Sequence, residues 1–95
     1  MKTRQLDAFF RNILSFDDFA GADSSLNGLQ IDNGGGDVRK IAFAVDACLE
    51  TFKRADAAGA GMLFVHHGLF WGKPLRIEGI LRRRLDFLLK HDIAL

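Results

Sequence analysis

The stretch Ile41–Asp46, with the sequence IAFAVD, decides the fold of this chain together with Met62–His67, MLFVHH. Each stretch begins with an apolar run of the length and character of a buried strand. Between them, apolar side chains recur at helical spacing, and Gly59 provides the left-handed residue that commonly ends a helix. A strand, a helix and a second strand in this order predict parallel strands joined by a right-handed crossover.

Three further segments flank this unit. Apolar side chains between Leu6 and Leu14 fall on one helical stripe and predict an amphipathic helix, with Thr3 as its N-cap. Leu29 and Ile31 alternate with polar residues in a short extended stretch. The spacing from Ile77 to Leu88 predicts a third helix. We therefore expect an α/β fold, a sandwich built around a strand–helix–strand unit.

The sequence stops at Leu95, where Ile93–Leu95 looks like the opening of another strand. A half-made interior strand leaves the backbone groups of its neighbour unpaired. We therefore expect residues 1–95 to be the N-terminal part of a larger α/β domain, truncated before the sheet is complete. The alternative is a frayed C-terminus on a small domain with two strands and three helices.

Composition narrows the classes of function. The chain has 95 residues and a net charge of +1, which gives no electrostatic case for binding nucleic acid or an acidic membrane. Its apolar runs are far shorter than the roughly 20 residues that span a bilayer. No signal peptide is recognisable, and the single cysteine cannot form an internal disulfide. We expect a cytoplasmic protein with neither a nucleic-acid nor a membrane partner.

Two adjacent histidines, His66 and His67, end the second apolar run and lead into a loop. The carboxyl ends of parallel strands are where open α/β sheets bind ligands, and imidazole is the commonest protein ligand for transition metals. Because side chains alternate across a strand, both rings reach one ion only if the backbone leaves strand geometry at His67, which Gly68 permits. The pair is a candidate for two metal ligands, against the alternative of a structural or incidental pair.

Asp46 ends the first strand and has two interpretations. The favoured one is the N-cap of the following helix. The alternative is a carboxylate that orients a metal-binding histidine. Cys48, on an apolar face of that helix, is most simply a small buried hydrophobic side chain.

Trp71 and Lys73 follow the histidines on the same loop. They could contact a planar or anionic substrate by stacking and charge. Equally, Phe70 and Trp71 could be buried at a subunit contact, where aromatic side chains are enriched. Nine Phe and one Trp in so short a chain also favour surfaces that meet another domain or subunit.

Four blocks of sequence stand in the order found in the NIF-three-like family, which the chain resembles over essentially its whole length. They are Asn27–Gln30 (NGLQ), Lys40–Ala47 (KIAFAVDA), His66–Lys73 (HHGLFWGK) and Arg84–Leu95, which ends in DIAL. The His-His-Gly block with its aromatic residues and the upstream NGLQ are the most specific. Members of this family often carry the name GTP cyclohydrolase, type one, class two.

The resemblance implies a longer protein with a pair of α/β domains, a dinuclear metal site and a ring-shaped hexamer. The ligands of the family include two adjacent histidines, an Asp in a His-x-Pro-Leu-Asp segment beyond the strand that begins at Ile93, and a late His and Glu. Only His66 and His67 carry over to this sequence, and no catalytic residue is assigned. The ions are divalent, two per site, with zinc, iron and manganese all open.

Two functions follow. The first is a metal-dependent hydrolase of the GTP cyclohydrolase kind with a small-molecule nucleotide substrate, in which Lys73 and Trp71 bind substrate. We expect this chain alone to be inactive, because the other ligands have no positions in it. The second is a non-catalytic module for self-association or protein interaction, favoured by the aromatic-rich composition.

Overall fold

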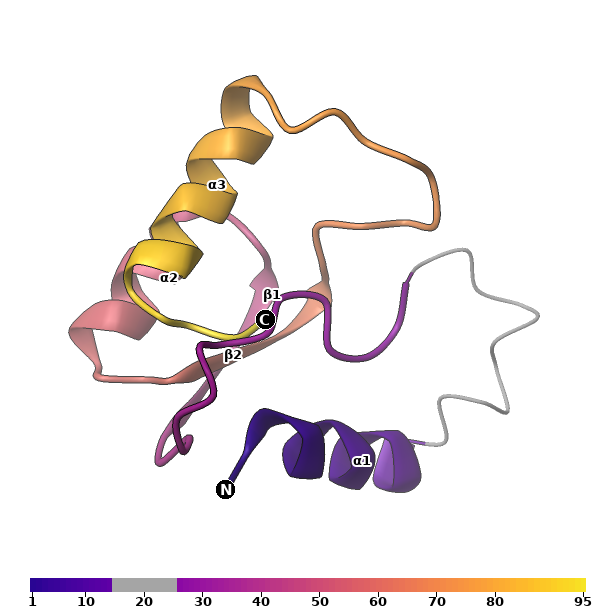
Figure 1. The fold of residues 1–95 in the computed structure, drawn as a ribbon, viewed down its shortest axis with the longest axis vertical. Coiled ribbons are helices and arrows are strands. Elements are labelled where there is room, and N and C mark those ends of the chain that lie inside the picture. The colour runs from indigo at the N-terminus through magenta and orange to yellow at the C-terminus, as the bar shows by residue number, and fades with distance from the viewer. Residues whose placement is uncertain (15–25) are drawn as a thin grey trace.

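The computed structural model describes residues 1–14 and 26–95. Its elements are α1 (Thr3–Leu14), β1 (Ile41–Asp46), α2 (Leu49–Ala57), β2 (Met62–His67) and α3 (Gly79–Lys90) (Figure 1). β1 and β2 pair in parallel, with Ile41 opposite Met62 and Asp46 opposite His67. The predicted strand–helix–strand unit and the α/β class are confirmed. None of the helices within the described ranges is long and apolar enough to cross a membrane.

The sheet continues on the other edge of β2 through the C-terminal residues. Ala94 forms a parallel bridge with Met62, and the Leu63 N–H donates to the Ala94 carbonyl at 2.8 Å. Beyond it, the Leu95 N–H donates to the Ile31 carbonyl at 2.9 Å. The strand predicted to open at residue 93 therefore forms as a short bridge beside β2, which is hydrogen-bonded in turn to residues 30–31. Residues 30 and 31 form a bend rather than the extended stretch predicted there.

Helices cover the two faces of this sheet. α2 and α3 lie side by side on one face, and α1 lies on the other (Figure 1). Because side chains alternate along β2, Leu63 packs toward α2 and α3 while Met62 packs toward Leu6 of α1. The largest fully buried side chains all belong to the first of these two cores: Phe52, Leu63, Leu88 and Ile93.

The sequence was a poorer guide to how the helices begin. Thr3 is the first residue of α1 rather than its N-cap, and its hydroxyl donates to Oδ1 of Asp32 at 2.6 Å. The N-cap of α2 is Cys48 rather than Asp46, because Cys48 has the extended backbone that precedes the helix. Its Sγ accepts the Thr51 N–H and lies 3.6 Å from the Thr51 hydroxyl, and these contacts lower the pKa of the Cys48 thiol. Cys48 is thus half-buried and polar in its contacts, not a simple core residue.

Two predicted apolar stripes are only partly buried. In α1, Leu6 is buried and Phe10 half-buried, whereas the remaining members of the stripe are exposed: Phe9, Ile13 and Leu14. In α3, Leu85 and Leu88 are buried, whereas Ile77 precedes the helix and Ile80 is exposed in its first turn. Glu78 is the N-cap of α3, and Gly79 has a φ of 57° at its start.

Candidate functional site

His66 and His67 are the last two residues of β2, at the carboxyl end of the parallel pair. Both side chains are exposed, and the centroids of their rings lie 4.5 Å apart with the ring planes inclined by 56°. β2 runs through His67, and Gly68 is not among the residues with positive φ. The backbone therefore keeps strand geometry at His67, and the departure given above as a condition for a shared ion does not occur. Adjacent Cα atoms are only about 3.8 Å apart, so exposed rings at an open strand end can swing together without it.

Asp46 ends the neighbouring strand directly opposite His67. Its Oδ1 lies 3.1 Å from Nδ1 of His67. A carboxylate can only accept a hydrogen bond, so Nδ1 carries the proton, and in the neutral ring Nε2 holds the free lone pair. Sequence reasoning favoured the N-cap role for Asp46. The partnership with His67 depends on the register of β1 against β2, which local sequence does not reveal.

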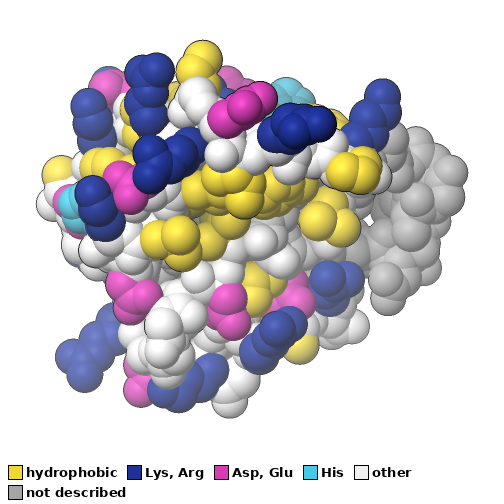
Figure 2. Space-filling view, turned by 45° about the horizontal axis from the view of Figure 1, so that its top comes forward, with side chains coloured by type: hydrophobic (Ala, Val, Ile, Leu, Met, Phe, Trp, Pro, Cys, Tyr) yellow, Lys and Arg dark blue, Asp and Glu magenta, His cyan; other side chains and the backbone are white. Residues whose placement is uncertain are grey.

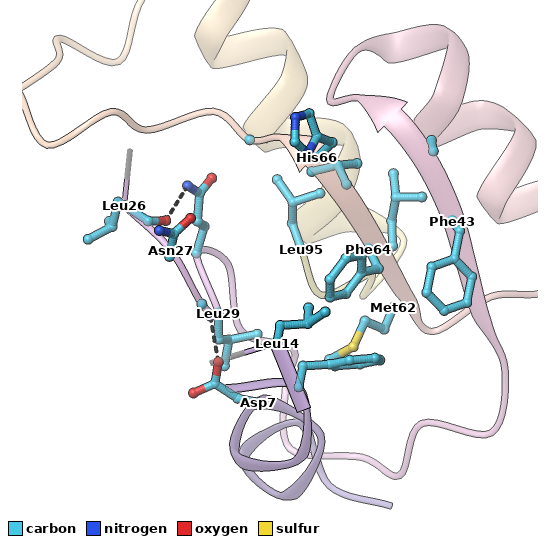
Figure 3. Close-up of a pocket in the computed structure, with 17 residues that line it drawn as sticks. Asp7, Leu14, Leu26, Asn27, Leu29, Phe43, Met62, Phe64, His66 and Leu95 are labelled. Atoms are coloured by element: carbon cyan, nitrogen blue, oxygen red, sulfur yellow. Dashed lines mark hydrogen bonds between the residues drawn. The ribbon is translucent and has the colours of Figure 1, made fainter. Parts of the chain in front are cut away.

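His66 faces a different environment. It lies at one end of a cavity of about 300 Å³, with Phe64, Met62 and Phe43 along it and Asp7 at the far end (Figure 3). Within the described part of the chain, no hydrogen bond involves its ring. Both of its ring nitrogens are therefore available to a ligand.

The loop after the histidines carries the two expected substrate contacts. The ring centroid of Trp71 lies 6.0 Å from that of His67, and the ring planes are inclined by 38°. Trp71 is 44% exposed, so an aromatic surface beside the histidines is open to solvent. Lys73 is exposed and makes no hydrogen bond or ion pair with another described residue. The structure thus brings Trp71 to the histidines and leaves the Lys73 ammonium in solvent.

The loop itself is held by a residue that sequence reasoning did not single out as functional. The side-chain amide of Gln30 hydrogen-bonds the backbone of Leu69 and Phe70. Its membership of the NGLQ block was the only available signal. Such a contact joins positions 40 residues apart, which no periodicity can indicate.

The donor set fits two positions of a borderline divalent metal. Imidazole nitrogen suits zinc and other late first-row ions, and the carboxylate on Nδ1 of His67 is the usual partner of a metal-binding histidine. No third His, Cys, Asp or Glu within residues 1–14 and 26–95 joins the pair in a group able to hold an ion. The described residues therefore offer part of a coordination sphere.

On the face drawn in Figure 2, basic and acidic side chains are mixed. Figure 2 shows hydrophobic side chains gathered at the centre of one face, between basic and acidic ones. Arg82, Arg83 and Lys90 of α3 lie near Asp86, which forms an ion pair with Lys90 at 3.1 Å. The third histidine, His91, donates from Nδ1 to the Phe87 carbonyl at 2.8 Å and stacks on the Phe87 ring, which indicates a structural role.

Comparison with known proteins gives one consistent family. The family model described as Duf34/NIF3 (NGG1p interacting factor 3) matches residues 1–95. A relative from Treponema pallidum (strain Nichols), named GTP cyclohydrolase 1 type 2 homolog, is 55% identical over the whole chain. One of the same name from Pyrococcus abyssi is 41% identical over the whole chain.

Solved structures agree with the sequence relatives. TTHA1606 from Thermus thermophilus superposes on 99% of this chain with a TM-score of 0.91 and 41% identity. Reduced HcgD from Methanocaldococcus jannaschii superposes on 99% with a TM-score of 0.81 and 30% identity. The chain covers 33% of the Treponema relative and 38% of each of these two structures. It therefore spans about a third of the length of the proteins that it matches.

Proposed function

Because the chain belongs to the Duf34/NIF3 family, we propose that His66 and His67 are ligands of a divalent metal site that serves a hydrolase. The observation that carries this proposal is the pair of exposed imidazole rings, 4.5 Å apart, at the carboxyl end of a parallel strand. Exposed, neighbouring imidazoles at this edge of a sheet suit ligand binding better than packing.

The hydrogen bonds of the site define the metal-binding atom of His67. Asp46 accepts a hydrogen bond from the Nδ1–H group of His67. Nε2 is therefore the atom of His67 that would bind the ion. The ring of His66 is free to use either nitrogen. Residues other than those described would supply the remaining ligands, including those of a second ion.

The reaction proposed is hydrolysis of a nucleotide such as GTP, in line with the name of the relatives. When bound, divalent ions polarise substrate oxygens and lower the pKa of water, which supplies a hydroxide nucleophile near neutral pH. The residues of this chain would bind and orient the substrate. Trp71 offers an aromatic face to a planar base, and the Lys73 ammonium offers a positive charge to a phosphate.

Zinc binding tests the first part of the proposal. We expect His66→Ala and His67→Ala each to weaken zinc binding, measured by calorimetry, by more than about 100-fold, a larger loss than that for a residue outside the coordination sphere. His91→Ala is the matched control, since that ring bonds the Phe87 carbonyl, and it should leave the affinity unchanged. Wild-type affinity in the His66→Ala, His67→Ala double variant would contradict the proposal.

Asp46 is tested as the residue that positions His67. Asp46→Ala should weaken zinc binding by about tenfold, whereas Asp46→Asn, whose amide oxygen still accepts from Nδ1, should lose less. Asp56→Ala is the control, because Asp56 lies beside His91 instead, at 3.7 Å from its Nε2. Equal effects of the Asp46 and Asp56 substitutions would exclude a positioning role for Asp46.

Hydrolysis is tested separately, by following the ultraviolet absorbance of the guanine base of GTP. Since the described residues supply only two ligands, we expect metal binding to be detectable under conditions where turnover by this chain is not. Where turnover is observed, in a protein that also supplies the other ligands, His66→Ala and His67→Ala should abolish it. Unchanged turnover in those variants would contradict the hydrolase assignment.

A further inference from the structure

We propose that Gln30 is a positioning residue that locks the loop after the histidines, and that Gly68 is a glycine because the Gln30 side chain occupies the space of its missing Cβ. The consequence for metal binding rests on the proposed function. The lock itself is testable without any metal. Nothing in the local sequence around the histidines indicates this contact, since Gln30 lies 39 residues before Leu69.

The amide of Gln30 uses both of its ends. Its Oε1 accepts the Leu69 N–H at 2.8 Å and the Phe70 N–H at 3.3 Å. Its Nε2 donates to the Phe70 carbonyl at 3.0 Å and to the Leu26 carbonyl at 2.8 Å. The side chain thus supplies the acceptor for the Leu69 and Phe70 N–H groups after the strand has ended, whereas the Phe70 carbonyl also accepts the Leu26 N–H at 3.2 Å.

Gly68 leaves the room that this arrangement needs. A Cβ built at residue 68 would lie 2.5 Å from Oε1 of Gln30 and 2.7 Å from its Cδ. Gly68 is not among the glycines with positive φ, so backbone conformation does not require glycine here. A Cβ at residue 68 would have to displace the Gln30 amide from its hydrogen bonds with Leu69 and Phe70.

Gln30 is itself firmly held. Its backbone N–H donates to the Leu95 carbonyl at 2.8 Å, which fixes it to the C-terminal residues beside β2. The preceding residue, Leu29, donates its N–H to Oδ1 of Asp7 in α1 at 2.8 Å. Gln30 is therefore held by the C-terminal residues and, through Leu29, by α1. Its side-chain amide in turn holds the backbone that follows His67.

The lock affects the proposed metal site because the loop that it holds leads from His67 to Trp71. Leu69 and Phe70 lie between His67 and Trp71, so fixing their backbone fixes where the Trp71 ring stands relative to the His67 ring. A loop released at Leu69 and Phe70 would let both rings sample other positions. Ligands held in a productive geometry bind metal more tightly than mobile ones, because less ordering remains to be done on binding.

Amide hydrogen exchange tests the lock directly. In the unsubstituted protein, the amides of Leu69 and Phe70 should be protected although they lie in a loop. Gln30→Met keeps the bulk of the side chain and removes its polar atoms. We expect it to speed exchange at Leu69 and Phe70 by about tenfold, the size expected for the loss of one protein hydrogen bond.

Two internal controls accompany this measurement. The Leu63 amide, which donates to Ala94 within the sheet, should keep its rate in Gln30→Met. Gln5→Ala, at the only other glutamine of the sequence, should leave Leu69 and Phe70 unchanged. Unprotected exchange of both loop amides in the unsubstituted protein would overturn the proposal, whether or not the variants fold.

A double-mutant cycle tests the steric role of Gly68. We expect Gly68→Ala to weaken zinc binding and to shift the emission of Trp71, the single tryptophan of the sequence. In a Gln30→Ala background, where the blocking side chain is gone, the same substitution should have a clearly smaller effect on the emission. Additive effects would overturn the steric explanation.

Zinc affinity separates this inference from the proposed function. Gln30→Met should weaken binding by about tenfold, as expected for residues that support ligands. Zinc binding that survives loss of both His66 and His67 would defeat the proposed function while leaving the lock to stand on its exchange data. Zinc binding that needs the histidines but ignores Gln30, with unchanged exchange at Leu69 and Phe70, would defeat the lock alone.

Discussion

At the scale of single residues, a hydrogen bond links the pKa of Asp32 to the stability of the fold. The hydroxyl of Thr3, a buried residue of α1, donates to Oδ1 of Asp32 at 2.6 Å. This bond, supported by the Asn33 N–H, holds the pKa of the Asp32 carboxyl below its usual value. It ties the start of α1 to the segment that follows residues 30–31.

The sign of the pH effect follows from that lowered pKa. In the unfolded chain the Asp32 carboxyl titrates near about 3.9, so the bond to its ionised form contributes its full stability above that pH. The contribution is lost as pH falls from about 4 through the lower pKa of the folded state. Thr3→Val should reduce the free energy of unfolding by about 1 kcal/mol at neutral pH and by less in acid. Urea unfolding measured at pH 7 and pH 3 checks this.

Asp32→Asn provides the control, because the amide does not titrate. The stability difference between Asp32→Asn and the unsubstituted protein should likewise shrink from neutral to acid pH. A difference that is constant between pH 7 and pH 3 in both variants would show that the ionisation of Asp32 does not contribute to stability.

At the scale of elements, α3 offers two adjacent leucines with opposite environments. Leu88 is fully buried in the core between α2, α3 and the sheet, whereas Leu89 is 65% exposed. Leu88→Ala should reduce the free energy of unfolding by about 2–5 kcal/mol, because it removes buried methyl groups and leaves a cavity. Leu89→Ala should change it by less than about 0.5 kcal/mol. Both substitutions have the same intrinsic effect on the helix, so chemical denaturation isolates packing. Similar losses of stability in the two variants would mean that Leu88 does not face the core and that α3 is oriented differently.

The elements also show what local sequence can and cannot predict. The strand–helix–strand unit was predictable because each of its parts carries its own signal: two apolar runs, a helical spacing and a terminal Gly59, whose φ is 76°. The start of α3 was not, since Ile77 and Ile80 continue an apolar period that the structure leaves exposed. Periodicity indicates which residues share a face but not whether a partner covers that face.

The candidate site divides in the same way. The position of His66 and His67 at a strand end follows from the apolar run that precedes them, and the sequence predicted it. The contacts of Asp46 with His67 and of Gln30 with the loop arise from strand register and from chain segments far apart in sequence. Such contacts form only when the sheet assembles, so no local pattern encodes them.

At the scale of the whole molecule, β1 is an edge of the sheet with exposed apolar side chains. Among the described residues β2 is its only neighbour, and Phe43 and Val45 are 68% and 62% exposed. The Phe43 ring packs beside that of Phe64, with centroids 5.5 Å apart, so an aromatic surface continues from the edge onto the α1 side of the sheet. An exposed edge of this kind favours association, which supports the alternative proposal of a self-associating module.

We therefore predict that this chain self-associates through the β1 edge and that Phe43→Glu weakens the association. A charge at this position would have to be buried unpaired between copies, so we expect the dissociation constant to rise by about tenfold or more. Leu89→Glu is the matched control, because Leu89 is equally exposed but lies on α3, away from the edge. Light scattering over a range of protein concentrations measures both variants. A monomeric unsubstituted chain, or an equal loss of association in the two variants, would show that β1 is not the surface that copies of the chain share.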